Sequence, residues 1–288
     1  MIVAVASGKG GTGKTTVAVN MAAALSRAQF SVRLVDCDVE EPNAHIFLKT
    51  VMTSRESAVV PVPVVDEEKC DGCGKCGDVC RFSAIIALGT KAITFPALCH
   101  GCGGCVMACP KKAITESSRE IGAIEKGVSQ GIEFIQGYLK IGEAMSPPLI
   151  RAVKKQAVGD GVTIIDAPPG TSCPVIQAIR GSDYVILVTE PTPFGLHDLD
   201  LAVETVRQIG IPFGVVVNRA GIGDARTHDY CAVQDIPIIG EIRDDRRIAE
   251  AYSRGELVID ALPQLGKEFL GIFGRAASGA RKREDDPQ

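Results

Sequence analysis

Apolar runs of strand length recur along the chain. The first, IVAVA at residues 2–6, precedes a glycine-rich turn and then TTVAVNMAAALSRA, whose Ala-rich apolar spacing is typical of a helix. Further β-branched runs lie at residues 32–36, 162–166, 184–189 and 213–218. Strands without a polar face belong to parallel sheets covered on both sides, so we expect these runs to form the buried centre of a sheet.

Helical patterns separate the later runs. Residues 196–209 and 244–254 read as helices, and IEFIQGYLKIG reads as a strand or hairpin that leads into a helical region at 147–157. Parallel strands that alternate with helices are joined by right-handed crossovers. The predicted fold class is therefore α/β, with a mostly parallel, doubly wound sheet.

The composition changes sharply near residue 61. VVPVPVVDEEKC opens a stretch rich in Gly and Cys that ends near Ser118. Because the strand and helix patterns resume afterwards, this stretch is predicted to be an insertion. The predicted domains are a discontinuous α/β domain, 1–60 and 119–288, and an inserted domain, 61–118.

Overall composition places few limits on function. With 288 residues, 45% hydrophobic and 23% charged, the sequence is typical of a globular protein, and its net charge of −4 gives no reason to expect a nucleic acid partner. No apolar run approaches the length of about 20 residues that spans a bilayer, and MIVAVAS is too short for a secretory signal. We therefore expect a cytoplasmic protein.

The turn after the first run reads GKGGTGKTT and satisfies the pattern G-x-x-x-x-G-K-[ST]. Such a loop turns backbone N–H groups towards phosphate oxygens, while Lys14 reaches the β- and γ-phosphates and Thr15 offers its hydroxyl to Mg²⁺. The flanking strand and helix favour this interpretation over a plain glycine turn. The predicted nucleotide-binding residues of this P-loop are Gly8, Gly10, Gly11, Thr12, Gly13, Lys14, Thr15 and Thr16.

Eight of the eleven cysteines form two runs with the same spacing, C-x₂-C-x₂-C-x₃-C, and the second run lies 29 residues after the first. This is the spacing of bacterial two-cluster ferredoxins, in which the fourth cysteine of each run binds the other run's [4Fe–4S] cluster. Zinc and disulfides are the alternatives, and a third cysteine at the same spacing is surplus for zinc. The predicted ligand sets are Cys70, Cys73, Cys76 and Cys109 for one cluster, and Cys99, Cys102, Cys105 and Cys80 for the other.

The segment KGGTGKT resembles the deviant P-loop of the MinD, ParA and nitrogenase iron protein class, and DCDVEEPN and DAPPG resemble its switch segments. The resemblance implies that ATP closes a homodimer in which Lys9 reaches the partner's phosphates. It also implies that Asp38 orients the attacking water, with strand-end capping as the alternative. Asp166 would hold Mg²⁺ through water, and Gly170 would donate its N–H to the γ-phosphate. Asn218 matches the base-reading position, and no N-K-x-D guanine signature is found, so ATP or ADP is favoured over guanine nucleotides.

Over essentially its whole length the chain resembles a MinD-type P-loop ATPase that carries an inserted 2[4Fe–4S] ferredoxin domain, a group related to the Mrp-type iron–sulfur carriers. Three functions are compatible with this resemblance. ATP would gate electron transfer through the clusters to an unidentified redox partner, or the protein would assemble and carry clusters for an acceptor protein. A spatial regulator of the MinD and ParA kind with redox-sensing clusters is the third.

Three cysteines lie outside the runs. Cys173 lies seven residues after Asp166, where the nitrogenase iron protein has a cluster ligand, but the second cysteine that such a site needs is missing. We therefore expect Cys173, like Cys37 and Cys231, to be a small buried thiol.

The C-terminal stretch LGKEFLGIFGRAASGA allows two interpretations. It is compatible with an amphipathic helix that touches a membrane, but four glycines weaken that helix, and a final helix that packs on the core is more common. Membrane recruitment is therefore not expected.

Overall fold

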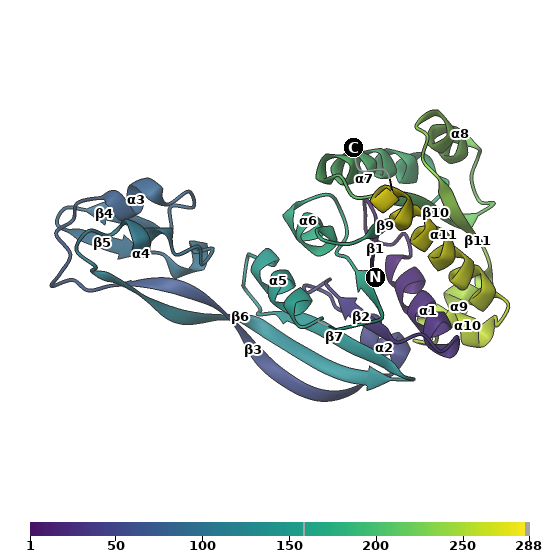
Figure 1. Cartoon of the computed structure of the whole chain (residues 1–288), viewed down its shortest axis with the longest axis horizontal. Helices are drawn as coiled ribbons and strands as arrows, with labels where there is room; N and C mark the ends of the chain where they lie inside the picture. The colour runs from purple at the N-terminus through teal and green to yellow at the C-terminus, as the bar shows by residue number, and fades with distance from the viewer. Residues whose placement is uncertain (158, 286–288) are drawn as a thin grey trace. The chain divides into compact units, whose positions relative to one another are not determined.

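The computed structural model describes residues 1–157 and 159–285, with side chains described up to residue 281. The chain divides into two compact units, coloured by residue number in Figure 1. The first unit consists of Met1–Arg55, Ile124–Tyr138 and Ile150–Gln288, and the second of Glu56–Ala123 and Leu139–Leu149. The second unit thus contains the predicted insertion, 61–118, together with residues on either side of it and the segment 139–149.

The sheet of the α/β unit has the strand order β11-β10-β9-β1-β8-β2-β7-β6-β3. Every pair from β11 to β7 is parallel. The five strands expected from apolar runs are all present, and the mostly parallel α/β fold class is confirmed. The seven parallel strands, from β11 to β7 in the sheet order, are β1 (Ile2–Ala6), β2 (Val32–Asp36), β7 (Ile132–Leu139), β8 (Val162–Asp166), β9 (Tyr184–Thr189), β10 (Phe213–Ala220) and β11 (Ile238–Arg243).

Two long strands were not predicted from the sequence. β3 (Val51–Val65) and β6 (Ile114–Ser129) are neighbours at one edge of the sheet, and each contributes residues to both units. β3 contains Pro61 and Pro63, which an edge strand tolerates because its outer N–H groups need no partner. A two-residue turn, 130–131, joins β6 to β7. IEFIQGYL, the first part of IEFIQGYLKIG, forms the single strand β7, so the strand is the one of the two expectations that the structure shows.

Helices cover both faces of the parallel strands. α1 and α11 pack on each other and on one face, while α6 and α7 contact β1 and β9. Successive residues of a strand point to opposite faces, so Ile186 and Val188 join the core under α1, and Leu187 lies against α6 and α7. The helices of this unit are α1 (Lys14–Arg27), α2 (Ala44–Leu48), α6 (Cys173–Ile179), α7 (Pro193–Ile209), α8 (Arg226–Val233), α9 (Arg246–Ser253), α10 (Val258–Ala261) and α11 (Leu265–Asp285). α5 (Pro147–Lys155) begins in the second unit and continues into this one.

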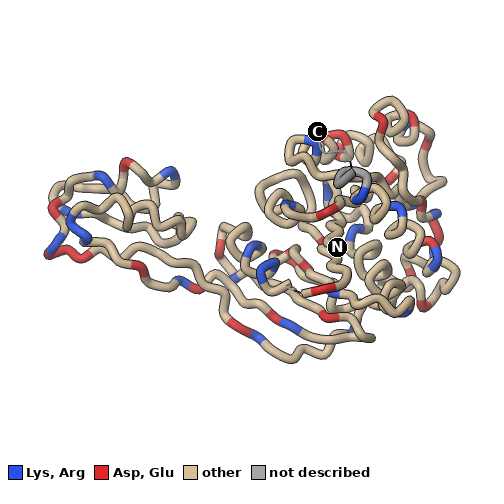
Figure 2. The backbone as a smooth tube through the Cα atoms, viewed as in Figure 1, with Lys and Arg blue, Asp and Glu red and all other residues tan. Residues whose placement is uncertain are grey.

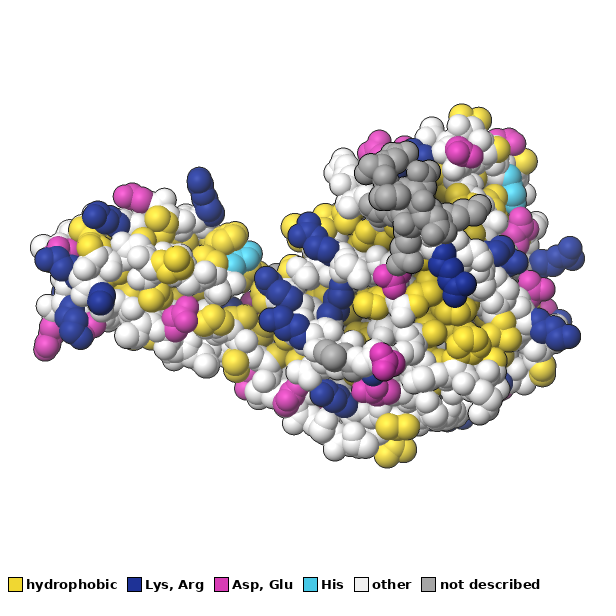
Figure 3. Space-filling model, in the orientation of Figure 1, with side chains coloured by type: hydrophobic (Ala, Val, Ile, Leu, Met, Phe, Trp, Pro, Cys, Tyr) yellow, Lys and Arg dark blue, Asp and Glu magenta, His cyan; other side chains and the backbone are white. Residues whose placement is uncertain are grey.

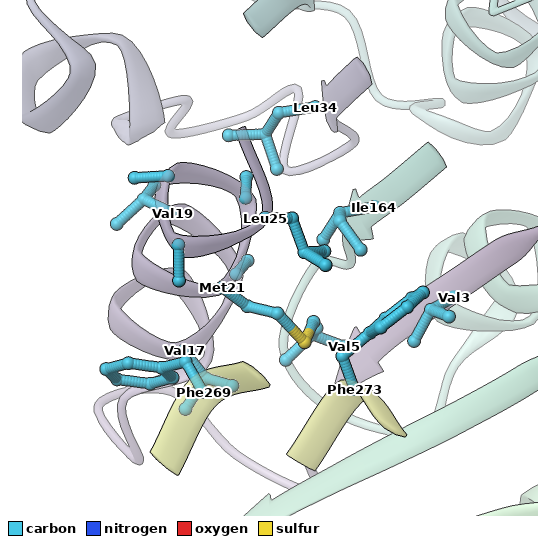
Figure 4. Close-up of a cluster of buried hydrophobic side chains, with 14 of the residues drawn as sticks. Val3, Val5, Val17, Val19, Met21, Leu25, Leu34, Ile164, Phe269 and Phe273 are labelled. Atoms are coloured by element: carbon cyan, nitrogen blue, oxygen red, sulfur yellow. The ribbon is translucent and has the colours of Figure 1, made fainter. Parts of the chain in front are cut away.

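The main core lies between α1, α11 and the sheet. Figure 4 shows Met21 of α1 directed between the strand residue Val5 and Phe273 of α11. Phe269, also of α11, belongs to the same cluster. Phe269 and Phe273 are both buried. The apolar face of the C-terminal helix thus packs on the core, which is the interpretation that the sequence favoured over contact with a membrane. Within the described residues, no helix is both long enough and apolar enough to cross a membrane.

Charged residues of both signs are interspersed along the backbone of each unit (Figure 2). Several form ion pairs at the surface, such as Arg254 with Glu256 at 2.9 Å. Because pairs that are open to water contribute at most about 1 kcal/mol each, the stability of the α/β unit depends mainly on its core.

The second unit repeats a short pattern of helix and strand. Its elements are α3 (Lys75–Val79), β4 (Ile85–Leu88), β5 (Lys91–Thr94), the 3₁₀ turn η1 (Pro96–Leu98) and α4 (Gly104–Ala108), and β4 pairs with β5 in antiparallel fashion. Apolar and basic side chains are both visible on its surface (Figure 3). One of its groups of packed side chains is centred on the buried residues Ile85, Ile114 and Cys76.

Candidate nucleotide site and cysteine pockets

The P-loop joins β1 to α1, and the fold leaves no room for side chains at two of its glycines. A Cβ at Gly8 would lie 1.9 Å from the carbonyl oxygen of Asp198. Gly13 has φ +94°, and a Cβ there would lie 2.3 Å from Nδ2 of Asn218. The same Nδ2 donates a hydrogen bond to the carbonyl oxygen of Thr12 at 2.8 Å. Asn218 therefore also fixes the shape of the loop, in addition to the base-reading role that the resemblance implies.

Lys14 begins α1 and is almost fully buried. Burial lowers the pKa of its ammonium group, and the carboxylates of Asp166, Asp38 and Asp36 oppose that shift. A lysine at this position of a P-loop is suited to contact the β- and γ-phosphates of a nucleotide, and a bound Mg²⁺ would offset the nearby carboxylates.

Asp166 ends β8, and the strand register places it opposite Asp36 at the end of β2. Neither of its carboxylate oxygens has a hydrogen-bond partner in the described part of the chain, although both are buried. Burial raises the pKa of Asp166 to about 7, while Thr15 and Lys14 hold it lower. Oxygen ligands with free lone pairs beside a threonine hydroxyl suit Mg²⁺, which binds through few protein ligands and keeps several waters. The residues present therefore fit a magnesium ion.

The two aspartates of DCDVEEPN have different surroundings. Asp36 accepts hydrogen bonds from the N–H groups of Asp38, Asn43 and Ala44 at 3.0–3.1 Å, so it holds the loop after β2 in place. Asp38 is only partly buried; burial and the nearby Glu40 and Glu41 raise its pKa to about 6, and Lys14 opposes the rise. A carboxylate with a pKa close to neutral is suited to accept a proton.

A cavity of about 660 Å³ lies above the P-loop. Its walls combine the P-loop with loops at the carboxyl ends of the strands, where ligands bind in open α/β sheets. One side is apolar and comes from α9, through Ile248, Ala249 and Tyr252. The predicted site residues that line the cavity are Gly10, Gly11, Gly13, Lys14, Thr15, Thr16, Asp38 and Asn218.

Other predicted residues do not line this cavity. Nζ of Lys9 lies 3.7 Å from Oδ2 of Asp198 in the same chain. The N–H of Gly170 donates to the carbonyl oxygen of Ser7 at 3.1 Å, so it would have to leave that partner to reach a phosphate. Gly8, Thr12 and Asp166 are also absent from the lining that the described residues form.

Sequence reasoning missed several residues around the site. Asp198 was not predicted, although its carboxylate pairs with Lys9 and its backbone lies against Gly8. Arg219 also lines the cavity, has φ +53° and pairs with Asp244 at 3.0 Å. Its position directly after Asn218 at a strand end was an available signal. Tyr252 gave none, because only the fold brings α9 to the P-loop.

The second unit contains two small pockets, each lined by four of the eight run cysteines. In both, three cysteines come from one run and the fourth from the other. The first pocket is lined by Cys70, Cys73, Cys76 and Cys109, and the second pocket by Cys80, Cys99, Cys102 and Cys105. The fold thus brings together the same two sets of side chains that the spacing predicts as ligand sets.

Backbone N–H groups point at sulfur atoms in both pockets. The N–H of Ala113 lies 3.3 Å from Sγ of Cys109, and the N–H of Ala84 lies 3.3 Å from Sγ of Cys80. Burial alone would raise the pKa of the Cys80 thiol, but N–H groups of the turn that follows it lower the pKa below its ordinary value. Thiols with N–H donors suit a metal–thiolate centre. No three His, Cys, Asp or Glu side chains in the described residues are placed to hold a single metal ion.

The remaining cysteines differ in exposure. Cys37 and Cys231 are buried, as expected, and burial raises the pKa of both thiols, that of Cys231 to about 11. Cys173 is exposed, so the expectation of a buried thiol is wrong there. It is the first residue of α6, directly after the loop that carries Gly170.

Comparisons with known proteins identify the family. Residues 3–258 match the CobQ/CobB/MinD/ParA nucleotide binding domain. An uncharacterized protein of Methanocaldococcus jannaschii is 34% identical over 261 residues, which cover 89% of this chain and 90% of that protein. An iron–sulfur cluster carrier protein of Pyrococcus horikoshii is 28% identical over 306 residues, 99% of this chain and 88% of that protein. The fold is similar to that of the septum site-determining protein MinD of Pyrococcus horikoshii in complex with Mg-ADP, with a TM-score of 0.60 at 20% identity over 94% of this chain and 93% of the other. The chain belongs to the CobQ/CobB/MinD/ParA family of nucleotide-binding proteins.

Proposed function

We propose that the protein is an ATPase in which the nucleotide state controls electron transfer through two [4Fe–4S] clusters held by a ferredoxin-like inserted domain. The observation that carries the proposal is the pairing of a P-loop cavity in one unit with two four-cysteine pockets in the other.

ATP binding and hydrolysis are supported by the residues of the cavity. Lys14 supplies a buried positive charge for the phosphates, and the unpartnered carboxylate of Asp166 is suited to a hydrated Mg²⁺. Asp38, with a pKa of about 6, is the group to orient and deprotonate the attacking water. Mg²⁺ would supply charge neutralisation between the phosphates when it is bound.

Iron–sulfur clusters are favoured over zinc by the shape of the cysteine sites. A cubane cluster spreads its four thiolate ligands over four iron corners, so it needs thiols around a pocket and not at one point. Ile85 and Ile114 pack against cysteines of both runs, so bound clusters would add to the stability of this group of side chains.

An ATP-dependent homodimer is part of the proposal, and the partial exposure of Lys9 supports it. In the single chain Lys9 pairs with Asp198, and its side chain is 34% exposed to solvent. An ATP-dependent homodimer would give Lys9 a phosphate of the partner's nucleotide as a stronger counter-charge.

The proposal is tested by anaerobic reduction of the purified protein, followed by electron delivery to an artificial acceptor with Mg–ATP, Mg–ADP or no nucleotide. We expect the rate of delivery to depend on the nucleotide, and the dependence to vanish in Lys14→Ala while iron content is unchanged. Equal rates under all three conditions in the wild-type protein would contradict the coupling.

A second function, delivery of clusters to acceptor proteins, is favoured by the relative from Pyrococcus horikoshii, whose name is iron–sulfur cluster carrier protein. An apo-ferredoxin acceptor distinguishes the two functions. Loss of iron from the protein to the acceptor under Mg–ATP supports the carrier function, whereas retention of iron with changed electron delivery supports the first.

A further inference from the structure

The two cysteine pockets are related by the repeat of 29 residues, and the residues that line them can be compared position by position. Asp71 of the first pocket corresponds to His100 of the second, and Lys111 of the first corresponds to Phe82 of the second. In each pocket these two positions meet. The repeat has therefore kept the contact and changed its chemistry.

In the first pocket the contact is an ion pair. Nζ of Lys111 lies 3.5 Å from Oδ2 of Asp71, and both side chains remain about half exposed. In the second pocket the contact is an aromatic stack, in which the ring centroids of Phe82 and His100 lie 3.5 Å apart and the ring planes make an angle of 16°. The first pocket thus has a charged, hydrated rim and the second an aromatic one.

A further charge distinguishes the pockets. Glu116 lines the second pocket. Its carboxylate lies over Gly103, since a Cβ added to that glycine would be 3.5 Å from Oε1 of Glu116. At the matching place in the first pocket, Cβ of Ala87 would lie 3.9 Å from a Cβ on Gly74. The second pocket therefore has a carboxylate where the first has a methyl group.

Reduction adds an electron to a cluster that is already negative, so nearby charge and water decide how easily it occurs. The ion pair at the first pocket sums to zero, whereas Glu116 adds a negative charge to the second, whose rim is aromatic. Building on the proposed function, we propose that the two cluster sites differ in reduction potential. The site of Cys70, Cys73, Cys76 and Cys109 is the more easily reduced, and Lys111 and Glu116 set the difference.

The test is a mediated redox titration of the full-length protein, followed by electron paramagnetic resonance of the reduced clusters. We expect two one-electron waves whose equilibrium constants differ at least tenfold, which is about 59 mV. Glu116→Gln should raise the lower potential alone, and Lys111→Gln should lower the higher potential alone. Lys112→Gln is the matched control, because Lys112 is exposed and lines neither pocket in the described chain.

A single wave for both clusters, or equal shifts in Lys111→Gln and Lys112→Gln, would overturn the inference. A shift of the lower potential in the opposite direction in Glu116→Gln would do the same. Iron and sulfide are measured in every preparation, so the absence of two [4Fe–4S] clusters from the wild-type protein would count against the proposed function. Two clusters with one shared potential would count against this inference alone.

Discussion

Replacement of Asp166 by asparagine tests the reasoning about the nucleotide site. Asp166 is buried at the end of β8, and in the described chain its carboxylate oxygens have no hydrogen-bond partner. Asp166→Asn keeps the size of the side chain and removes its charge. The ligand-free protein should become more stable near pH 8, because a carboxylate whose charged form is disfavoured by burial is lost, while Mg-dependent nucleotide binding should weaken.

The magnitude follows from the raised pKa. Burial raises the pKa of Asp166 to about 7 from an ordinary 3.8, so between these values the folded state holds a proton that the unfolded state has released. The free energy of unfolding therefore falls as pH rises, by about 1.4 kcal/mol per pH unit, and levels off above pH 7. From pH 5 to pH 8 the wild-type protein should lose about 2.5 kcal/mol that the variant keeps. Burial and the charge of Asp166 both raise the pKa of Asp36. Removing that charge in the variant therefore lowers the pKa of Asp36, which further reduces the loss of stability with rising pH.

The assay is urea unfolding of both proteins at pH 5, 6, 7 and 8, followed by a signal from the α/β unit. The quantity of interest is the difference between the two free energies of unfolding at each pH. Repeating the series with Mg–ADP should stabilise the wild-type protein increasingly as Asp166 ionises, and the variant much less. A difference that stays constant from pH 5 to pH 8, or Mg–ADP stabilisation that is equal in both proteins, would refute the reasoning.

Three further changes address the loop and the core. Gly8→Ala would place a Cβ 1.9 Å from the carbonyl oxygen of Asp198, so we expect a loss of at least about 2 kcal/mol in urea unfolding, together with weaker nucleotide binding; unchanged stability would contradict the close approach. Asn218→Ala removes the hydrogen bond to Thr12 and should cost about 1 kcal/mol and lower ADP affinity in calorimetry; wild-type values for both would speak against its role in shaping the loop. Phe269→Ala should cost about 3–5 kcal/mol if α11 packs on the core, whereas a membrane-facing residue would cost little.

The sequence predicted the parts of the fold that a local pattern specifies. β1, β2, β8, β9 and β10 contain near-continuous apolar runs, as is typical of strands that are buried on both faces. β3 and β6 have no such run, because they lie at the edge of the sheet and many of their side chains are exposed. Their prolines, serines and charges therefore gave no recognisable strand pattern.

The same distinction applies to the candidate sites. The spacing of glycines and cysteines within a short segment predicted which side chains would meet, since those contacts are local or follow from an internal repeat. The pairing of Lys9 with Asp198 joins segments that are far apart in the sequence, so no spacing could indicate it. The exposure of Cys173 was missed for a related reason, because the fold alone decides whether the start of α6 is covered.

The central claim is that a nucleotide-binding chain holds two [4Fe–4S] clusters whose ligands cross between the two cysteine runs. Iron and acid-labile sulfide in the anaerobically purified full-length protein test it most directly, with Cys109→Ser and Cys173→Ser measured alongside. The account predicts about eight irons and eight sulfides per chain for the wild-type protein and for Cys173→Ser. In Cys109→Ser it predicts a damaged or lost cluster at the site of Cys70, Cys73 and Cys76, with the other cluster unchanged. Zinc in place of iron, or a Cys109→Ser defect confined to the cluster of Cys99, Cys102 and Cys105, would contradict it.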